Sequence, residues 1–347
     1  MNATKTVLAA ATAAMLFGIG SAEAQSVTGA GSTFIYPALS QWADAYKKDT
    51  GVEVNYQAIG SGGGLQQLAA KTVTFAASDK PLQADDLDSK GYVQWPVIMG
   101  GIVPVVNLKG VKADDLVLDG KTLADIYLGK VKTWNDKEIQ ALNPKMKLPD
   151  TAITVVHRSG GSGTTFNFTD YLNKVSPEWK SKVGSSTEVN WPAGIGGKGN
   201  QGVAQYVSTV PGAIGYVEYA FALQGKLAWT RLKNQSGNAV SPNLDSFKAA
   251  AKNADYTKVP GYALILTDQP GDDTWPILAS TFVLMYEQPQ DPEQATEALK
   301  FFDWVFKNGD AAAEKLEYIS IPQSLAPTFE KDWAHVKSDG KALWPAS

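Results

Sequence analysis

The sequence predicts an α/β protein in which strands and helices alternate along the chain. Runs of apolar and β-branched residues at 52–58, 102–107 and 152–156 are typical of strands. Apolar residues at helical spacing follow glycine-rich loops, as at 37–48 and 165–174. The repeated order of strand, glycine loop, helix and strand is the pattern of βαβ units, from which α/β folds are built.

The remaining elements follow from the same two periodicities. In the helix at 37–48, Leu39, Trp42 and Tyr46 share one apolar face. Pro37 suits the first turn of that helix, and Gly51 suits its C-cap. Further strands are expected at 74–78, 213–219, 227–232 and 277–285, and further helices at 65–71, 123–128, 201–209, 244–252, 292–307 and 329–337.

Residues 1–24 are expected to be a secretory signal peptide. Lys5 supplies a positive charge before an apolar run at 7–19, and small residues at 22 and 24 form a cleavage pattern. A retained membrane anchor is the alternative, but the run is short for a spanning helix. The rest of the 347-residue chain exceeds what one hydrophobic core usually supports, so two lobes are expected.

Composition narrows the class of protein further. The chain has no cysteine, which excludes disulfides, thiolate metal sites and a lipidated N-terminal cysteine. Its net charge is −4 and it has no polybasic run, so nucleic acid is not an expected partner. We therefore expect an exported, unlipidated protein of the bacterial periplasm.

Three glycine-rich loops, each leading into a helix, are the main clue to function. They lie at 29–34 (GAGSTF), 60–64 (GSGGG) and 159–164 (SGGSGT). Helix N-termini offer free backbone N–H groups and a partial positive charge, and glycine lets a ligand approach closely. Taken singly, Ser32, Thr33, Ser61 and Ser162 could simply cap these helices. Together the loops predict a cage for a small tetrahedral anion.

Two charged residues support the cage. Arg158 follows a strand and precedes the third loop, and its guanidinium can bind an oxyanion through two parallel N–H bonds. Asp79 follows the strand at 74–78, and a carboxylate in such a cage suits only an anion that carries a proton. Phosphate near neutral pH carries one, whereas sulfate does not. The alternatives are a solvated arginine and an aspartate that caps the turn at Lys80 and Pro81.

These motifs resemble the phosphate-binding proteins of bacterial ABC importers. The resemblance is carried, in order, by residues 29–34, 56–64, 75–79, 158–164, 212–219 and 301–304. It implies a two-lobed periplasmic-binding-protein fold of the type II, flytrap kind, with lobe I at 25–98 and 275–347 and lobe II at 99–274. It also implies hinge crossings near 98–103 and 270–278, and closure on one inorganic phosphate in a cleft between the lobes.

The resemblance also implies the site and the partners. The phosphate ligands would be Ser32, Thr33, Phe34, Ser61, Asp79, Arg158, Ser162, Gly163 and Thr164. The partners would be phosphate and an inner-membrane ABC permease complex, with no cofactor, no metal and no enzymatic activity, and the chain is expected to be a monomer. The family commonly has an aspartate two residues after the arginine, where this chain has Gly160, so Arg158 is expected to be less constrained.

Other functions have weaker support. Residues 194–199 match a dinucleotide fingerprint followed by Glu218, but they lie mid-chain and are expected to be a loop before the helix at 201–209. His157 and His335 are the only histidines and lack metal-ligand spacing. A phosphatase using Ser61 or Thr33 as nucleophile is the main alternative, although no base stands beside either. Arsenate is protonated like phosphate and is a second possible ligand.

Overall fold

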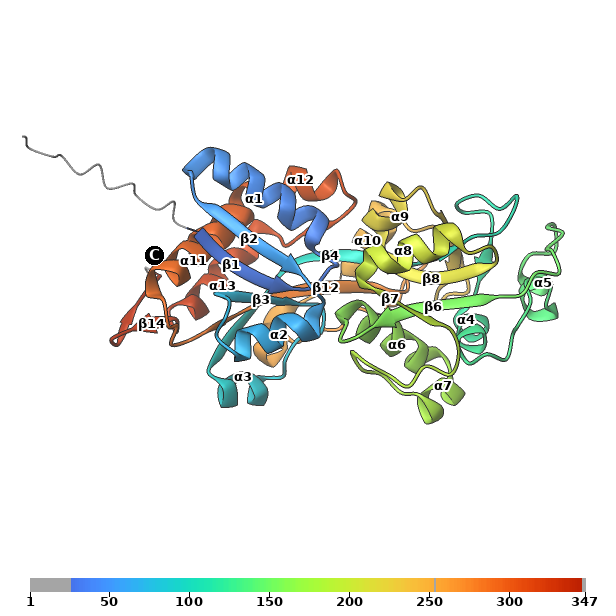
Figure 1. The fold of residues 1–347 in the computed structure, drawn as a ribbon, viewed down its shortest axis with the longest axis horizontal. Coiled ribbons are helices and arrows are strands. Elements are labelled where there is room, and N and C mark those ends of the chain that lie inside the picture. The colour runs from blue at the N-terminus through green and yellow to red at the C-terminus, as the bar shows by residue number, and fades with distance from the viewer. Residues whose placement is uncertain (1–25, 253, 345–347) are drawn as a thin grey trace, which may run out of the picture.

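The computed structural model describes residues 26–252 and 254–344, and it has the expected α/β, two-lobed architecture (Figure 1). The predicted signal peptide lies outside the described residues. Lobe I contains β1 (Ser26–Gly31), α1 (Tyr36–Thr50), β2 (Glu53–Ala58), α2 (Ser61–Ala69), β3 (Phe75–Ser78), α3 (Ala84–Lys90), α11 (Pro292–Asn308), α12 (Asp310–Glu314), β13 (Ile319–Ser320) and α13 (Ala326–Trp333). A small hairpin of β14 (Lys337–Ser338) and β15 (Lys341–Ala342) follows.

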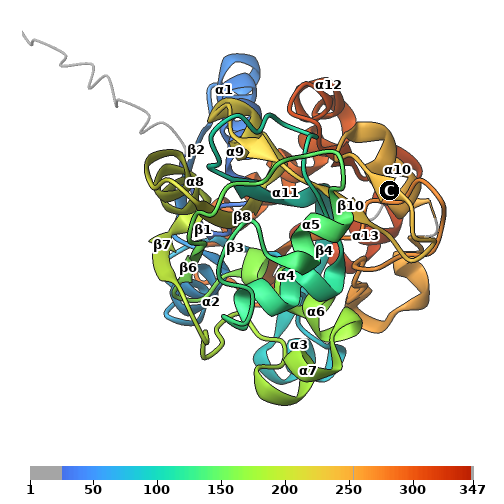
Figure 2. The same cartoon turned by 90° about the vertical axis from the view of Figure 1, so that its right-hand side faces the viewer.

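Lobe II is built from the middle of the chain. It contains α4 (Gly120–Tyr127), α5 (Lys137–Leu142), β6 (Thr154–Ser159), α6 (Gly163–Val175), α7 (Pro177–Lys182), β7 (Ile195–Lys198), α8 (Gly199–Thr209), β8 (Ala213–Glu218), α9 (Tyr219–Gln224), β9 (Ala228–Trp229) and α10 (Leu244–Ala251). A second sheet joins β5 (Val117–Leu118), β10 (Arg231–Lys233) and β11 (Ala239–Val240). In Figure 2, which looks along the long axis, helices lie on both sides of the sheet.

One long strand joins the lobes. β4 (Tyr92–Val106) pairs with β12 (Leu278–Tyr286) along its first part and with β8 along its last, and all fifteen of its residues are buried. The main sheet therefore runs without a break in the order β2-β1-β3-β12-β4-β8-β6-β7. Thr281 pairs with Ile98 and Phe282 with Pro96, so Val97 of β4 is the extra residue of a bulge, next to a proline of the kind that sheets tolerate at bulges.

The strand directions bring one edge of each lobe together. β1 is parallel to β2 and β3, and β6 is parallel to β7 and β8. β8 is antiparallel to β4, which runs from lobe I into lobe II. The carboxyl ends of both parallel sets therefore face the boundary between the lobes, where ligands of α/β proteins bind.

The structure corrects several predicted boundaries. Residues 92–101 belong to β4, although Pro96, Gly100 and Gly101 weaken the strand pattern. Glycine is required at 101 because a Cβ there would lie 2.2 Å from the Phe247 ring. The loop expected at 194–199 contains the edge strand β7, the strand expected at 227–232 divides into β9 and β10, and the helix expected at 329–337 ends at Trp333.

The predicted lobe boundaries fall inside β4, at 98/99, and shortly before β12, at 274/275, and they remain predictions. One segment assigned to lobe II by sequence contacts lobe I instead. Gly261 accepts a hydrogen bond of 2.7 Å from Gln94, and the Tyr262 ring packs edge-on against Phe329. Among the described residues, no helix has the length and apolar character needed to cross a membrane.

The glycines of α2 differ in how closely they pack. A Cβ on Gly64 would lie 2.4 Å from Gly31 Cα and 2.6 Å from Ala30 O, whereas a Cβ on Gly63 would meet only the Ile59 side chain at 3.1 Å. Gly64→Ala is therefore expected to lower the free energy of unfolding by about 1–3 kcal/mol, because backbone cannot move aside as a side chain can.

The measurement is chemical denaturation of both variants. Gly63→Ala is the matched control and should leave stability unchanged or raise it, since alanine favours a helix interior. Equal losses in the two variants would contradict the packing argument.

Candidate functional site

Four helix N-termini meet where the lobes join. α1 and α2 begin there from lobe I, and α6 and α8 begin there from lobe II. The polar side chains around them are almost completely buried, with exposed fractions of 4% or less for Ser32, Thr33, Ser61, Asp79, Arg158, Ser162, Thr164, Asn200 and Thr281. Buried polar groups of this kind must be hydrogen-bonded or prepared for a ligand. We call this set the cage.

Three hydroxyl groups of the cage each accept two hydrogen bonds. Ser61 Oγ accepts from the backbone N–H of Asp79 at 3.2 Å and of Gly163 at 3.1 Å. Thr33 Oγ1 accepts from Asn200 N at 3.2 Å and Asn200 Nδ2 at 2.9 Å. Thr164 Oγ1 accepts from Arg158 Nη1 and from Asn200 Nδ2, both at 3.3 Å.

A hydroxyl group has one proton to donate and two lone pairs to accept with. Because N–H donors occupy both lone pairs of these three oxygens, each hydroxyl can act towards a ligand only as a donor. The cage is therefore prepared for an acceptor-rich molecule such as an oxyanion. These hydroxyls are held by N–H groups, and a general base, which nucleophilic catalysis would require, is not among their partners.

Arg158 brings the positive charge of the cage. Its guanidinium is buried, and burial lowers its pKa, although the guanidinium remains protonated. Among the described residues its Nε finds no hydrogen-bond partner, and the bond from Nη1 to Thr164 is long. Donors left over on a buried cation favour a bound anion.

Asp79 is the only carboxylate that the sequence placed in the cage. Its Oδ1 accepts a hydrogen bond of 2.8 Å from Thr281, which lies in β12 across from the bulge in β4. Burial raises the pKa of the Asp79 carboxyl to about 6, although hydrogen bonds from Ser32 and Thr281 and the charge of Arg158 lower it. Asp79 does not cap the turn that follows, because Ser78 Oγ accepts the bond from Lys80 N instead.

The structure brings all nine predicted site residues to the lobe boundary, but their local roles differ. Ser162 Oγ accepts from Thr165 N and caps α6, which is the alternative left open for it. Ser32 Oγ accepts from Phe34 N at 2.9 Å, so this backbone N–H is already paired. Neither Ser32 nor Thr33 caps α1, whose N-cap is Ile35, and the N-cap of α2 is Gly60 rather than Ser61.

Gly160, which stands where the resemblance suggested an aspartate, has a φ of +76°. That left-handed conformation favours glycine, and a Cβ there would meet open space. His157, which precedes Arg158, stacks on Trp191 with ring centroids 4.7 Å apart.

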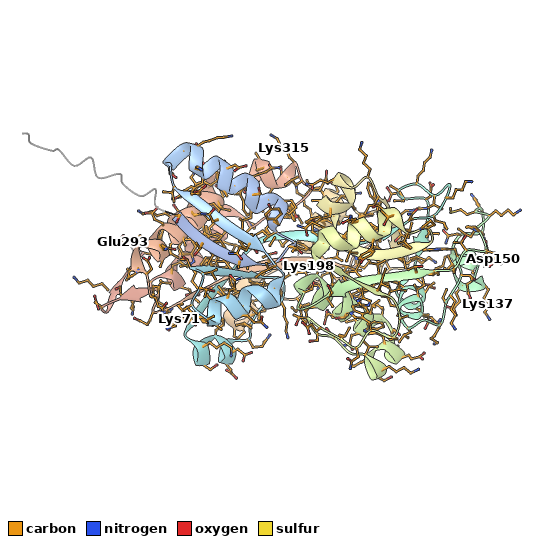
Figure 3. The ribbon with its side chains drawn as sticks, in the orientation of Figure 1. Lys71, Lys137, Asp150, Lys198, Glu293 and Lys315 are labelled. Carbon is orange, nitrogen blue, oxygen red and sulfur yellow. The ribbon has the colours of Figure 1, made fainter. Side chains whose placement is uncertain are left out.

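Direct contacts across the boundary close the lobes on the cage. Gly62 N donates to Gly161 O at 3.1 Å, and Asn167 Nδ2 donates to Asp79 O at 2.7 Å. A Cβ on Gly62 would lie 2.9 Å from Gly161 Cα, so the contact requires glycine. Lys198, labelled in Figure 3, lies at this junction and is exposed just before α8.

Sequence reasoning missed Asn200 and Thr281. Asn200 lies in the first turn of α8 and contacts both Thr33 of lobe I and Thr164 of lobe II. The signal was present, because the glycine-rich run at 194–199 leads into a helix as the other three loops do. Thr281 lies within a buried strand, and no sequence pattern marked it.

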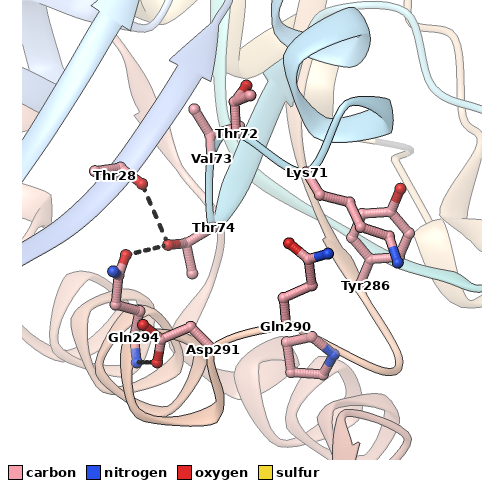
Figure 4. A pocket seen from close by; sticks show the side chains of 10 residues that line it. Thr28, Lys71, Thr72, Val73, Thr74, Tyr286, Gln290, Asp291 and Gln294 are labelled. Carbon is pink, nitrogen blue, oxygen red and sulfur yellow. Dashed lines mark hydrogen bonds between the residues drawn. The ribbon is translucent and has the colours of Figure 1, made fainter.

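A hollow lies at the other end of the lobe I strands, away from the cage (Figure 4). It has a volume of about 140 Å³ and lies beside Thr28, Thr74 and Gln294. These side chains bond to one another, with Thr74 Oγ1 at 2.8 Å from Gln294 Oε1, so they are not prepared for a ligand as the cage is. No cluster of metal-ligating side chains occurs in residues 26–252 and 254–344.

Comparisons with known proteins agree with this geometry. A family model described as a PBP superfamily domain matches residues 19–308. The phosphate-binding protein PstS of Pasteurella multocida is 51% identical over 324 residues, covering 93% of this chain and 94% of the relative. PstS of Haemophilus influenzae is 50% identical over 312 residues, covering 90% and 93%. These names describe binding proteins rather than enzymes, in agreement with the non-enzymatic prediction.

A solved structure shares the fold. The high-affinity periplasmic phosphate-binding protein PfluDING, bound with phosphate, superposes with a TM-score of 0.70 at 21% identity, covering 92% of this chain and 96% of that chain. The matches to the two PstS relatives extend over nearly the whole of both sequences at about half identity. The chain belongs to the PstS family of phosphate-binding proteins within the PBP superfamily.

Proposed function

We propose that this protein is the phosphate receptor of an ABC importer, binding inorganic phosphate between its lobes and delivering it to an inner-membrane permease. The three hydroxyl groups whose lone pairs are filled by N–H donors carry the proposal. They can only donate to a ligand, and the buried Arg158 guanidinium has donors to spare. The names of the relatives supply the identity of the anion.

In this proposal each predicted residue has a role in the cage. Thr33, Ser61 and Thr164 donate their hydroxyl protons, and Arg158 supplies the one positive charge. Asp79 accepts the proton that phosphate carries, while neighbouring residues supply backbone N–H groups and hold the loops. The complete proposed set is Ser32, Thr33, Phe34, Ser61, Asp79, Arg158, Ser162, Gly163 and Thr164, supported by Asn200 and Thr281.

The proposed setting follows from the same reasoning. The mature protein would be an unlipidated periplasmic monomer, with lobe I at 25–98 and 275–347 and lobe II at 99–274. The crossings near 98–103, within β4, and near 270–278, before β12, would act as the hinge, and β4 pairs with strands of both lobes. The closed form would be the one that the permease recognises.

Calorimetric titration of phosphate-free protein tests this function. Phosphate should bind tightly with one site, and millimolar sulfate should leave the titration unchanged, because a site built for a ligand proton rejects analogues lacking it by roughly 10⁴–10⁵. Asp79→Asn should let sulfate compete, since an amide can donate to it. Absence of heat with phosphate would refute the proposal, and sulfate competition in the unchanged protein would remove Asp79 from its role.

The pKa of Asp79 makes the discrimination depend on pH. As pH falls through about 6, the carboxyl gains a proton, loses its charge and becomes a donor. Sulfate remains fully ionised, so its affinity should rise roughly tenfold for each unit that the pH falls from 8 towards 6, and should level off below 6, where Asp79 is already protonated. Sulfate titrations at pH 5 and pH 8 measure this, with Asp79→Asn as the control that should show no such rise. Equal sulfate affinity at both values would contradict the mechanism.

Asn200 should matter as much as a direct ligand. Asn200→Ala removes the donors that occupy lone pairs of Thr33 and Thr164, so these hydroxyls can turn away from phosphate. Phosphate binding should weaken roughly 10- to 100-fold, since a hydrogen bond to a charged group is worth about 1.5–3 kcal/mol. Asn308→Ala, which removes an exposed amide bonded only to its own helix, is the control for the same titration.

A further inference from the structure

A buried glutamate beside the cage has no part in the function proposed so far. Glu218 ends β8 and is completely buried. Its Oε2 lies 2.6 Å from the hydroxyl oxygen of Tyr318, which precedes β13. The same hydroxyl oxygen lies 2.6 Å from the backbone carbonyl oxygen of Phe34. The three groups form a chain from lobe II to the loop between β1 and α1.

Counting protons shows which form of Glu218 the chain requires. Tyr318 has one hydroxyl proton, and the Phe34 carbonyl can only accept. If Tyr318 donates to Phe34, the short contact with Glu218 needs a proton on the carboxyl group. If Tyr318 donates to an ionised Glu218, its oxygen faces the Phe34 carbonyl without a proton between them. Both contacts are hydrogen bonds only when Glu218 is protonated.

The surroundings of Glu218 favour the same form. Burial raises the pKa of its carboxyl to about 8, and the charge of Asp79 adds to this, although hydrogen bonds from Tyr318 and from the backbone of Ala220 and Tyr219 lower it. Ala220 N lies 3.0 Å from both carboxyl oxygens. Within the described part of the chain, no salt bridge involves Glu218, so the titratable groups that bear on it are Tyr318 and Asp79.

Both ends of the chain are attached to the cage. The backbone N–H of Glu218 donates to Asn200 Oδ1 at 3.0 Å, and Asn200 in turn holds Thr33 and Thr164. Phe34, at the other end, directly follows Thr33 in the sequence. A change in the protonation of Glu218 therefore acts on the loop that presents a proposed phosphate ligand.

We propose that Glu218 is a proton-carrying positioning residue, whose proton completes the chain through Tyr318 to Phe34 and holds the Thr33 loop in the closed protein. The inference rests on the proposed function. When the lobes open and water reaches Glu218, the carboxyl releases its proton to solvent. Phosphate binding, which closes the lobes, therefore takes one proton up from solvent at this site.

The consequence is a fall in phosphate affinity as pH rises. A carboxyl that binds its proton more tightly in the closed than in the open form favours closure below its open-form pKa and loses that effect as pH rises through its closed-form pKa. Between about pH 5 and 8 this contribution approaches tenfold for each pH unit. Phosphate and Asp79 titrate in part of the same range, so variants must isolate Glu218.

The experiment is phosphate titration calorimetry between pH 5 and 9, repeated in buffers of different ionisation enthalpy, which counts the protons taken up. Glu218→Gln keeps a donor towards Tyr318 but cannot titrate, so its proton uptake should be about one lower than that of the unchanged protein near pH 7. Glu317→Gln is the matched control, because Glu317 precedes Tyr318 but bonds to Leu244 N. Glu317→Gln should keep the proton uptake of the unchanged protein and the same change of phosphate affinity with pH.

Two further measurements keep the inference open to refutation. Tyr318→Phe removes the hydroxyl group that links Glu218 to Phe34 and leaves the Glu218 residue itself unchanged. This variant should bind phosphate at least tenfold more weakly at pH 6. The infrared carbonyl band of a protonated carboxyl group at pH 7 should be present in the unchanged protein and absent in Glu218→Gln. Identical proton uptake in Glu218→Gln and the unchanged protein, or unweakened binding in Tyr318→Phe, would overturn the inference. Failure of the unchanged protein to bind phosphate would instead refute the proposed function.

Discussion

Proton counting among buried hydroxyl groups is the constraint on which the site depends. Ser61, Thr33 and Thr164 each accept from two N–H donors, so each has only a proton left to offer. In water a hydroxyl group finds a hydrogen-bond partner in any orientation, but these hydroxyl groups are buried, so the neighbouring protein groups set their orientation. The N–H neighbours thus leave three hydroxyl groups that can only donate to a ligand, and beside the buried Arg158 guanidinium such donors suit an oxyanion.

Closure of the lobes is what completes this pattern. Asn200 and Gly163 come from lobe II, whereas Thr33 and Ser61, which accept from them, come from lobe I. The long strand β4 pairs with both lobes, so their relative position is set by a continuous ladder rather than by a flexible linker. Glycines at 62 and 161 allow the two backbones to touch, because a side chain on either would collide with the other.

An acidic protein can bind an anion because the attraction is local. The net charge is −4, yet the cage contains one buried guanidinium and four helix N-termini. Asp79 works against that attraction unless the ligand carries a proton, and burial holds its pKa near 6 rather than at its usual value. Burial raises the pKa of Glu218 further, to about 8, so two carboxyl groups near one site can differ in protonation.

The sequence by itself determined the α/β class, most element positions and the three loops that converge, because glycine runs and apolar periodicity are local properties. It also marked Arg158 and Asp79, since a charged residue at the end of a predicted strand can be read from the sequence, and Arg158 also precedes a glycine loop. Only the tertiary structure decided the partners of the cage hydroxyls and the places of Asn200, Thr281 and Glu218. These depend on contacts between residues more than 35 positions apart in most cases, as with Thr281 and Asp79, separated by 202 positions. A local sequence pattern does not specify which residues distant in the chain will form these hydrogen bonds.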